Sequence, residues 1–288
     1  NRDVTPDDAR FATQPRFSAN SQRLYFLGSE RDEDDGRKSL YRIDLGSSSN
    51  DPTVLSAAYS PMSPGDINKY SVSADERRIA LEATRNGRLS VFFIDPASPR
   101  NEIRLSHSLA FDEAVIGSTV GLDPSQGGSA NLERVGYTAR RFLVGSIGAY
   151  VAEVRAAELA NQLCPAPNAP IVAGHGAQAV AFRADNAAML YMRQDGAAVI
   201  HEAVIDSTAP HEIVGTGFFG AHDATGNTVV LRRALAPNDY PALAVAVRGA
   251  FGAPTAIGSP GQAAWLSDLS GAARGVVLIG EAPPGTGP

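Results

Sequence analysis

A short pattern that returns along the chain constrains the fold more than any other feature of this sequence. It consists of an apolar or aromatic residue, a short polar turn and then an apolar strand. Its clearest forms begin at Phe17-Ser18-Ala19-Asn20 and at Val72-Ser73-Ala74-Asp75. Repeats with a period of tens of residues indicate a solenoid, a propeller or a related array. The sequence therefore predicts one structural unit used several times.

The repeated unit has the composition of antiparallel β-structure. Arg23–Leu27 and Ser39–Leu45 are rich in the Tyr, Phe, Leu and Ile residues that favour strands. Asn86-Gly87 and Asp195-Gly196 separate pairs of apolar runs, and such dipeptides are strong hairpin signals because they tolerate positive φ. Six repeats are predicted, starting near Gln14, Lys69, Ala114, Ala177, Phe218 and Gln262.

The pattern resembles the WD-like repeats of TolB-type β-propellers. Four segments carry the resemblance: Phe17-Ser18-Ala19-Asn20, Val72-Ser73-Ala74-Asp75, Phe182-Arg183-Ala184-Asp185 and Trp265-Leu266-Ser267-Asp268. It implies an all-β propeller, with six blades of four-stranded antiparallel sheet as the expected number. A blade cannot bury both of its faces alone, so neighbouring blades must pack together. We expect Phe17, Phe182 and Trp265 to lie between blades.

The predicted domain organisation is a single propeller over residues 14–280 with additions. Residues 1–13 form an amino-terminal arm, and 281–288 form a Pro- and Gly-rich flexible tail. An insertion near 155–170 combines a helical pattern over Arg155–Leu163 with a connector containing Pro165, Pro167 and Pro170. We expect this insertion to cover a surface or a partner, or to cap the third blade.

Two repeats are incomplete. In the third, strands are predicted at Val115–Leu122, Arg134–Thr138, Arg141–Val144 and Tyr150–Val154, without a recognisable Ser-Asp turn. The sixth repeat lacks its outer strands, which would leave an open apolar edge. Segment Ala9–Thr13 is expected to close the ring by covering that edge. Further carboxy-terminal residues or a partner protein are the alternatives.

Composition limits the partners and the compartment. A net charge of −6 disfavours a general nucleic-acid-binding protein, which needs a basic face. No apolar run approaches the roughly 20 residues of a membrane helix. The single cysteine, Cys164, excludes an internal disulfide. The chain begins with Asn1, for which a removed secretion signal is one explanation, so we expect a periplasmic or secreted protein.

Several short motifs resemble ligand-binding sites. Gly215–Gly220 matches the dinucleotide pattern GxGxxG, but no helix can open after it, so a connector is predicted. Asp32–Gly36 has no glutamate at the twelfth loop position, which predicts a solvated loop, with weak cation binding as the alternative. The histidines lack zinc-ligand spacing, and no metal or cofactor is predicted. His222 and Asp223 are the predicted tunnel-facing binding pair, with turn capping as the alternative.

The leading functional hypothesis is a non-enzymatic binding or assembly scaffold. Its partners would be proteins, and the chain could serve as a subunit of a membrane-associated complex of the cell envelope. Loops on a rigid disc commonly carry recognition. The alternative is a polysaccharide lyase similar to propeller-type oligogalacturonate lyases, or another enzyme with a site in the axial tunnel. That enzyme would require a cluster of histidine and arginine side chains, usually with a metal, at one mouth of the tunnel, and the histidines of this sequence are scattered.

Overall fold

A computed structural model describes the chain in a series of strands and turns. The described residues are 11–29, 38–47, 52–57, 66–106, 109–122, 128–143, 147–154, 170–172, 178–183, 185–195, 197–205, 207, 209–222, 227–233, 242–257, 263–269 and 276–281. The chain divides into two compact units. Unit 1 comprises Asn1–Gly121, Asn131–Val135 and Ala152–Asn168, and unit 2 comprises Leu122–Ala130, Gly136–Val151 and Ala169–Pro288.

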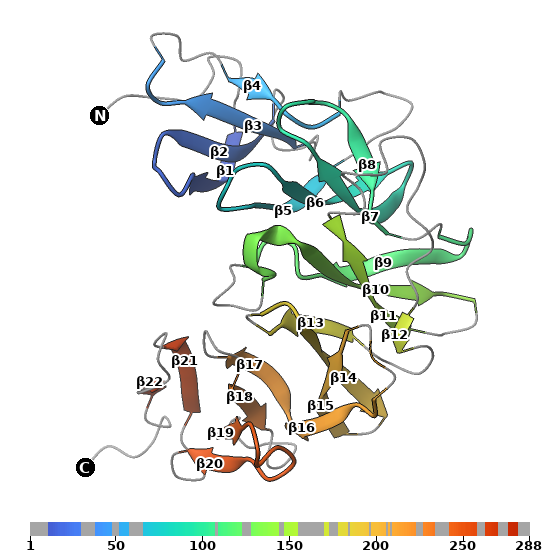
Figure 1. Cartoon of the computed structure of the whole chain (residues 1–288), viewed down its shortest axis with the longest axis vertical. Helices are drawn as coiled ribbons and strands as arrows, with labels where there is room; N and C mark the ends of the chain where they lie inside the picture. The colour runs from blue at the N-terminus through green and yellow to red at the C-terminus, as the bar shows by residue number, and fades with distance from the viewer. Residues whose placement is uncertain are drawn as a thin grey trace. The chain divides into compact units, whose positions relative to one another are not determined.

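The described structure is almost entirely antiparallel β-sheet (Figure 1). The first sheet has the order β1 (Phe11–Phe17), β2 (Arg23–Ser29), β3 (Ser39–Asp44), β4 (Thr53–Val54), and the second β5 (Ile67–Val72), β6 (Ile79–Arg85), β7 (Arg88–Ile94), β8 (Glu102–Arg104). The third contains β9 (Glu113–Ser118), β10 (Arg134–Arg141), β11 (Ile147–Glu153) and β12 (Pro170–Val172). The all-β prediction is confirmed.

The remaining strands repeat the same order. The fourth sheet contains β13 (Gln178–Phe182), β14 (Ala188–Asp195), β15 (Ala197–Val204) and β16 (Glu212–Thr216), and the fifth β17 (Phe218–His222), β18 (Thr228–Arg233), β19 (Ala242–Val247) and β20 (Thr255–Ile257). The sixth pairs β21 (Ala263–Leu269) with β22 (Val276–Glu281). Five sheets thus have four strands, and among the described residues the sixth has two, as its sequence predicts.

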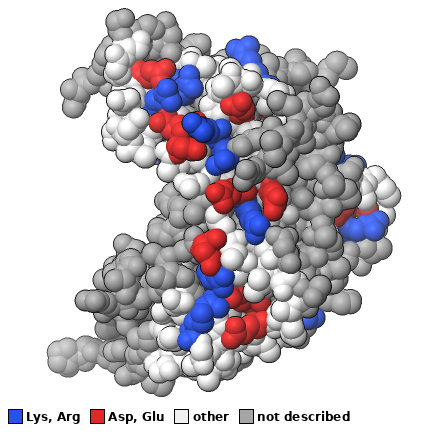
Figure 2. Space-filling model, viewed as in Figure 1, with Lys and Arg blue, Asp and Glu red and all other residues white. Residues whose placement is uncertain are grey.

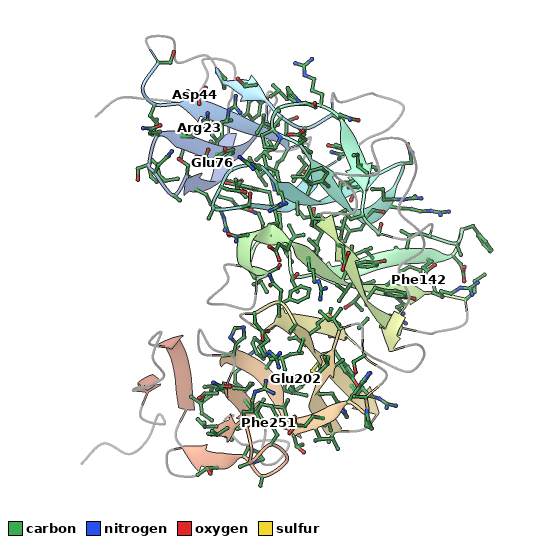
Figure 3. The ribbon with its side chains drawn as sticks, in the orientation of Figure 1. Arg23, Asp44, Glu76, Phe142, Glu202 and Phe251 are labelled. Carbon is green, nitrogen blue, oxygen red and sulfur yellow. The ribbon has the colours of Figure 1, made fainter. Side chains whose placement is uncertain are left out.

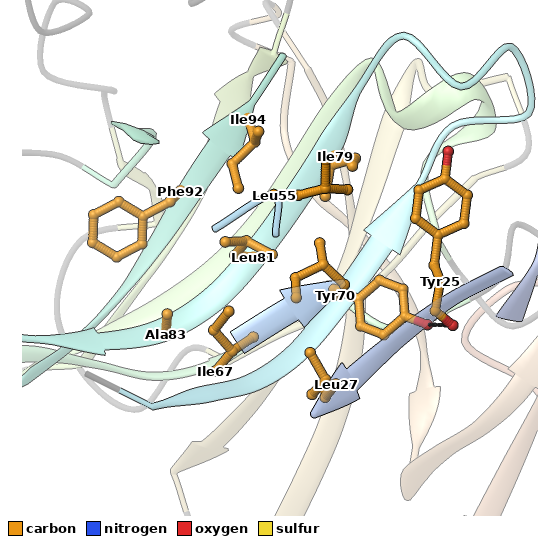
Figure 4. Close-up of a cluster of buried hydrophobic side chains, with 11 residues drawn as sticks. Tyr25, Leu27, Leu55, Ile67, Tyr70, Ile79, Leu81, Ala83, Phe92 and Ile94 are labelled. Atoms are coloured by element: carbon orange, nitrogen blue, oxygen red, sulfur yellow. Dashed lines mark hydrogen bonds between the residues drawn. The ribbon is translucent and has the colours of Figure 1, made fainter. Parts of the chain in front are cut away.

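The core of unit 1 lies between the first and second sheets. Its residues come from β2, β3, β5, β6 and β7 and from the segment after β4 (Figure 4): Tyr25, Leu27, Leu40, Leu55, Ile67, Tyr70, Ile79, Leu81, Ala83, Phe92 and Ile94. Alternate residues of β2 and β3 point to the opposite face, where the rings of Phe26 and Tyr41 stack at 5.3 Å. Middle strands are therefore buried on both faces, which is why they read as continuous apolar runs.

Unit 2 has the same construction. One face of the fourth sheet packs against the fifth through residues such as Leu190, Ile200 and Leu231. The other face carries Phe182, which is fully buried in a cluster with Ala149 of β11. The predicted position of Phe182 between sheets is confirmed.

Phe17 was predicted to occupy the equivalent position, and this prediction is wrong. Its side chain is 66% exposed. Within the described residues, no cluster of buried side chains includes Phe17, whereas Phe182 packs in a cluster with Ala149 of the third sheet. The strand β1 also begins at Phe11, earlier than the predicted Gln14, and Phe11, Ala12 and Thr13 pair with β2. Ring closure by the arm stays a prediction, since residues 1–10 lie outside the described part of the chain.

The polar turn between the first two strands is built from side-chain hydrogen bonds. Ser18 Oγ donates to Asn20 Oδ1 at 2.7 Å and accepts from the Arg23 amide. Ser73 and Asp75 make the same contact at 2.6 Å. The third residue after each serine, Ser21 or Glu76, has positive φ. The short polar residues thus close the turn as the sequence predicts.

The third repeat has a turn of similar sequence where none was predicted, and this turn contains the short 3-10 helix Ala130–Leu132. The signal is Ser129-Ala130-Asn131-Leu132-Glu133-Arg134, which has the serine, the small residue, the asparagine and the arginine at the spacing of Ser18 to Arg23. Leu132 has φ 54°, matching the 56° of Ser21. A glycine, Gly128, replaces the aromatic residue before Ser129, and the pattern was missed for that reason.

Two strands of the third repeat also differ from their predicted bounds. Arg134–Arg141 is one continuous strand, so the predicted break before Arg141 and the strand Arg141–Val144 are wrong. The fourth strand is Pro170–Val172, which pairs with β11 at the edge of the sheet. An edge position accommodates Pro170, which has no backbone N–H to contribute to a ladder.

The glycine-rich segment between the fourth and fifth sheets is described, and several other predicted segments are not. Gly215–Gly220 joins β16 to β17 directly, with Gly217 at φ 138°, and the strand β17 continues to His222, so the segment is the predicted connector. The acidic segment Asp32–Gly36, the predicted helix Arg155–Leu163 and the tail 282–288 lie outside the described residues. No described helix has the length and apolarity needed to cross a membrane.

Candidate binding site on the inner strands

The first strands of the first three sheets, β1, β5 and β9, belong to unit 1 and are here called the inner strands. Tyr70 of β5 donates through its hydroxyl to the carbonyl of Gln14 in β1 at 2.6 Å. Ser118 of β9 donates to Glu82 of β6, the strand paired with β5, at 2.6 Å. These bonds fix three strands from three sheets against one another.

Bulges shape the first two inner strands. The pairing of β1 with β2 shifts between Thr13 and Arg16, where Gln14 has φ 53°. The pairing of β5 with β6 shifts between Ile67 and Lys69. A bulge re-aims the side chains that follow it, and such irregularities are frequent near functional sites. In both strands the first paired residue after the bulge is a cation, Arg16 or Lys69.

Arg16 is held between an aromatic ring and a carbonyl group. Its guanidinium carbon lies 5.8 Å from the centroid of the Tyr70 ring, and its Nη2 donates to the carbonyl oxygen of Gly121 at 2.5 Å. Tyr70 is fully buried, and burial raises the pKa of its hydroxyl above the ordinary value. The ring therefore stays neutral and provides a cation–π surface.

Lys69 lies beside the same glycine. Its Cβ and Cδ pack at 3.4 Å from the position that a Cβ would have on Gly121. Gly121 has φ 90°, and its amide donates to Ser71 Oγ at 2.7 Å. Gly121 thus lies against the stem of the Lys69 side chain and forms hydrogen bonds with Ser71 and Arg16, so one glycine adjoins the side chains of both cationic residues.

The Lys69 ammonium is the group that can accept a ligand. Its side chain is 46% exposed, and Nζ lies 3.7 Å from Oε2 of the buried Glu82. That separation is an ion pair and exceeds hydrogen-bond length. The same Glu82 oxygen already accepts the Ser118 hydroxyl. Within the described residues, Lys69 therefore has an electrostatic partner and three N–H donors available to a solvent-borne anion.

On the face of the molecule in Figure 2, the described acidic and basic side chains lie next to each other, so this face does not carry charge of a single sign. Among the described residues, no group of three or more His, Cys, Asp and Glu side chains is arranged for a metal ion.

The residue predicted to face the tunnel, His222, lies at the end of β17 in unit 2. It is 1% exposed, and its ring centroid is 6.1 Å from that of Phe219. Asp223 lies outside the described residues, so the proposed role of this pair stays a prediction. The buried ring would have to move before it could contact a ligand.

The structure brings together two other histidines that spacing alone did not connect. The Tyr191 hydroxyl is 2.7 Å from His211 Nδ1, and the rings of Tyr191 and His201 stack at 5.1 Å. The register of the β14–β15 hairpin places Tyr191 opposite His201. Counting residue pairs outward from the Asp195-Gly196 turn would have found this contact.

Comparisons with known proteins bear on the fold. No family model and no curated protein matches this sequence. Among solved structures, Porphyromonas gingivalis dipeptidyl peptidase 4 is similar with a TM-score of 0.60 and 14% identity, over 88% of this chain and 40% of that chain. The fold is a β-propeller. The five four-stranded sheets are its blades.

Two further propellers are similar at lower scores. The β-propeller domain of the Trilobed protease from Pyrococcus furiosus has a TM-score of 0.49 and 13% identity, over 89% of this chain and 73% of that chain. TolB from Acinetobacter baumannii has a TM-score of 0.47 and 15% identity, over 89% of this chain and 57% of that chain. This propeller spans less than half the length of the dipeptidyl peptidase.

Proposed function

We propose that this propeller is a binding scaffold that holds an anionic segment of a partner protein on its inner strands. The observation that carries the proposal is the pair of cations, Arg16 and Lys69, that face one glycine on a rigid three-strand surface. Carboxylates of an acidic peptide are suitable ligands, since charge-assisted hydrogen bonds to carboxylates are shorter and stronger than neutral ones. The protein acts in the periplasm or outside the cell, as part of a cell-envelope assembly.

Side chains that are already held in place favour a binding role, because they lose less conformational entropy when the ligand binds. Arg16 is fixed by Tyr70 and Gly121 before any ligand arrives. Preorganised groups lose less conformational freedom when the complex forms. The ammonium of Lys69 is a point charge on a flexible stem and can adjust to the ligand. The planar guanidinium of Arg16 donates hydrogen bonds in fixed directions.

The composition of the chain gives a direct test. Lys38 and Lys69 are the only lysines, so carbodiimide coupling of a labelled oligoglutamate peptide can be assigned by mass spectrometry. We expect coupling at Lys69, loss of peptide binding in Lys69→Gln, and retention of binding in Lys69→Arg. Lys38→Gln is the matched control. If the Lys69→Gln variant bound the oligoglutamate peptide as tightly as the parent, the proposal would be overturned.

A second candidate is an enzyme acting at the same surface. It is favoured by the 2.6 Å hydrogen bond from the Ser118 hydroxyl to the Glu82 carboxylate, because a hydroxyl paired with a base is the starting arrangement for nucleophilic catalysis. Incubation with peptides and with oligogalacturonates separates the two roles. A scaffold leaves both substrates intact, whereas turnover that disappears in Ser118→Ala would identify an enzyme.

A further inference from the structure

The hairpin between β10 and β11 in unit 2 ends in a compact tip with an unusual surface. The tip is the segment Arg140–Leu143. Along β10 the residues from Val135 to Ala139 are buried, and burial ends at Arg140. Phe142 is then 56% exposed and Leu143 is 73% exposed. Two adjacent large apolar side chains are thus exposed to solvent in the turn that follows β10, where Figure 3 labels Phe142.

A rigid stem supports this tip. The rings of Tyr137 in β10 and Tyr150 in β11 stack across the hairpin at 5.1 Å. Tyr137 is fully buried. The stem therefore belongs to the packed blade, and the tip follows directly from it.

Two positively charged side chains lie next to the exposed apolar residues in the sequence. Arg140 and Arg141 immediately precede Phe142, and both are exposed. The Arg140 guanidinium carbon lies 5.6 Å from the centroid of the Phe142 ring. An arginine beside an aromatic ring combines an apolar body with a cationic head, which is the arrangement preferred at the boundary between lipid headgroups and acyl chains.

We propose that the Arg140–Leu143 tip binds an anionic lipid bilayer, with Phe142 and Leu143 entering the interface and the arginines meeting lipid phosphates. Exposed apolar side chains can enter a bilayer, whereas a protein partner would need a pocket shaped to fit them. The protein's net charge of −6 opposes approach to an anionic surface, so the attraction has to be local. Screening within about 10 Å allows this, because distant acidic groups then contribute little. The proposal is independent of the inner-strand site.

The test is flotation of the purified chain with vesicles of phosphatidylcholine, with and without phosphatidylglycerol. We expect the parent to bind the anionic vesicles. Binding should weaken about fivefold in Arg140→Gln, since one arginine near an anionic surface contributes roughly that factor. The double variant Phe142→Ser/Leu143→Ser should lose binding by about tenfold or more, because little apolar area is left to bury.

The control is Ile213→Ser, which removes an exposed apolar side chain from the edge strand β16 of the same unit. It should bind as the parent does. Thermal unfolding of each variant confirms that the blade is intact. Failure of the parent to float with anionic vesicles overturns the proposal, as does equal binding by the double variant. Equal loss in Ile213→Ser would show that the effect is not specific to the tip.

Discussion

Arg23 donates a 3.0 Å hydrogen bond to Glu76 and so joins the start of β2 to the turn of the second sheet (Figure 3). The same Glu76 oxygen accepts the Tyr25 hydroxyl at 2.8 Å, and Arg23 also contacts Asp44 in its own sheet. Unit 2 has a comparable group in which Glu202 binds Arg183 and Arg248. In both units a nearly buried carboxylate connects successive blades.

Replacing Glu76 with Ala should lower the free energy of unfolding by about 2 kcal/mol, mainly because the buried Tyr25 hydroxyl loses its acceptor. The Arg23 side chain is 40% exposed and remains hydrated, so loss of its charge partner adds little. Urea denaturation measures the change. Glu76→Gln keeps an acceptor and should retain at least half of the lost stability. Parent-like unfolding of Glu76→Ala would show that the contact is not a stabilising one.

Phe182→Ala should destabilise the protein by roughly 3–5 kcal/mol, since the ring is fully buried between sheets. Phe17→Ala should change stability by less than about 0.5 kcal/mol, because the ring is mostly exposed. Thermal unfolding of both variants gives the comparison. The earlier expectation for Trp265 stays a prediction, since its side chain lies outside the described residues. Equal effects at Phe17 and Phe182 would contradict the burial argument.

Acid should weaken unit 2 through Asp185. The hydrogen bond from Arg183 holds the pKa of this carboxyl below its usual value. Its contribution to stability is therefore complete above the unfolded pKa of about 3.9 and is lost as the pH falls through the lower folded value. Asp185→Asn should flatten the decrease of the unfolding temperature below about pH 4. An unchanged acid profile in the variant would count against this role.

The segment between β11 and β12 can be tested by replacement. Residues 156–169 should be exchanged for a Gly/Ser linker of equal length, which leaves Pro170 and its pairing with Tyr150 in place. If the segment only covers a surface or a partner, the unfolding temperature should stay within a few degrees of the parent. Loss of the folded state would assign the segment to the core of the third blade.

The sequence determined the strands of this protein and much of its local structure. Alternation of apolar residues and turn dipeptides predicted the hairpins, and short-range hydrogen bonds such as Ser73 to Asp75 form as expected. These features depend on neighbours within a few residues, so the sequence contains them directly. The turn at Ser129 was also available to sequence reasoning and was missed because its aromatic residue is replaced by Gly128.

The tertiary structure decided which residues meet across sheets. Arg16, Lys69 and Gly121 are distant in sequence, and the packing of three inner strands brings them together. The same packing buries Phe182 and leaves the equivalent Phe17 exposed. Two similar local patterns can differ in this way because burial depends on the neighbouring sheet, which the residues of the pattern itself do not specify.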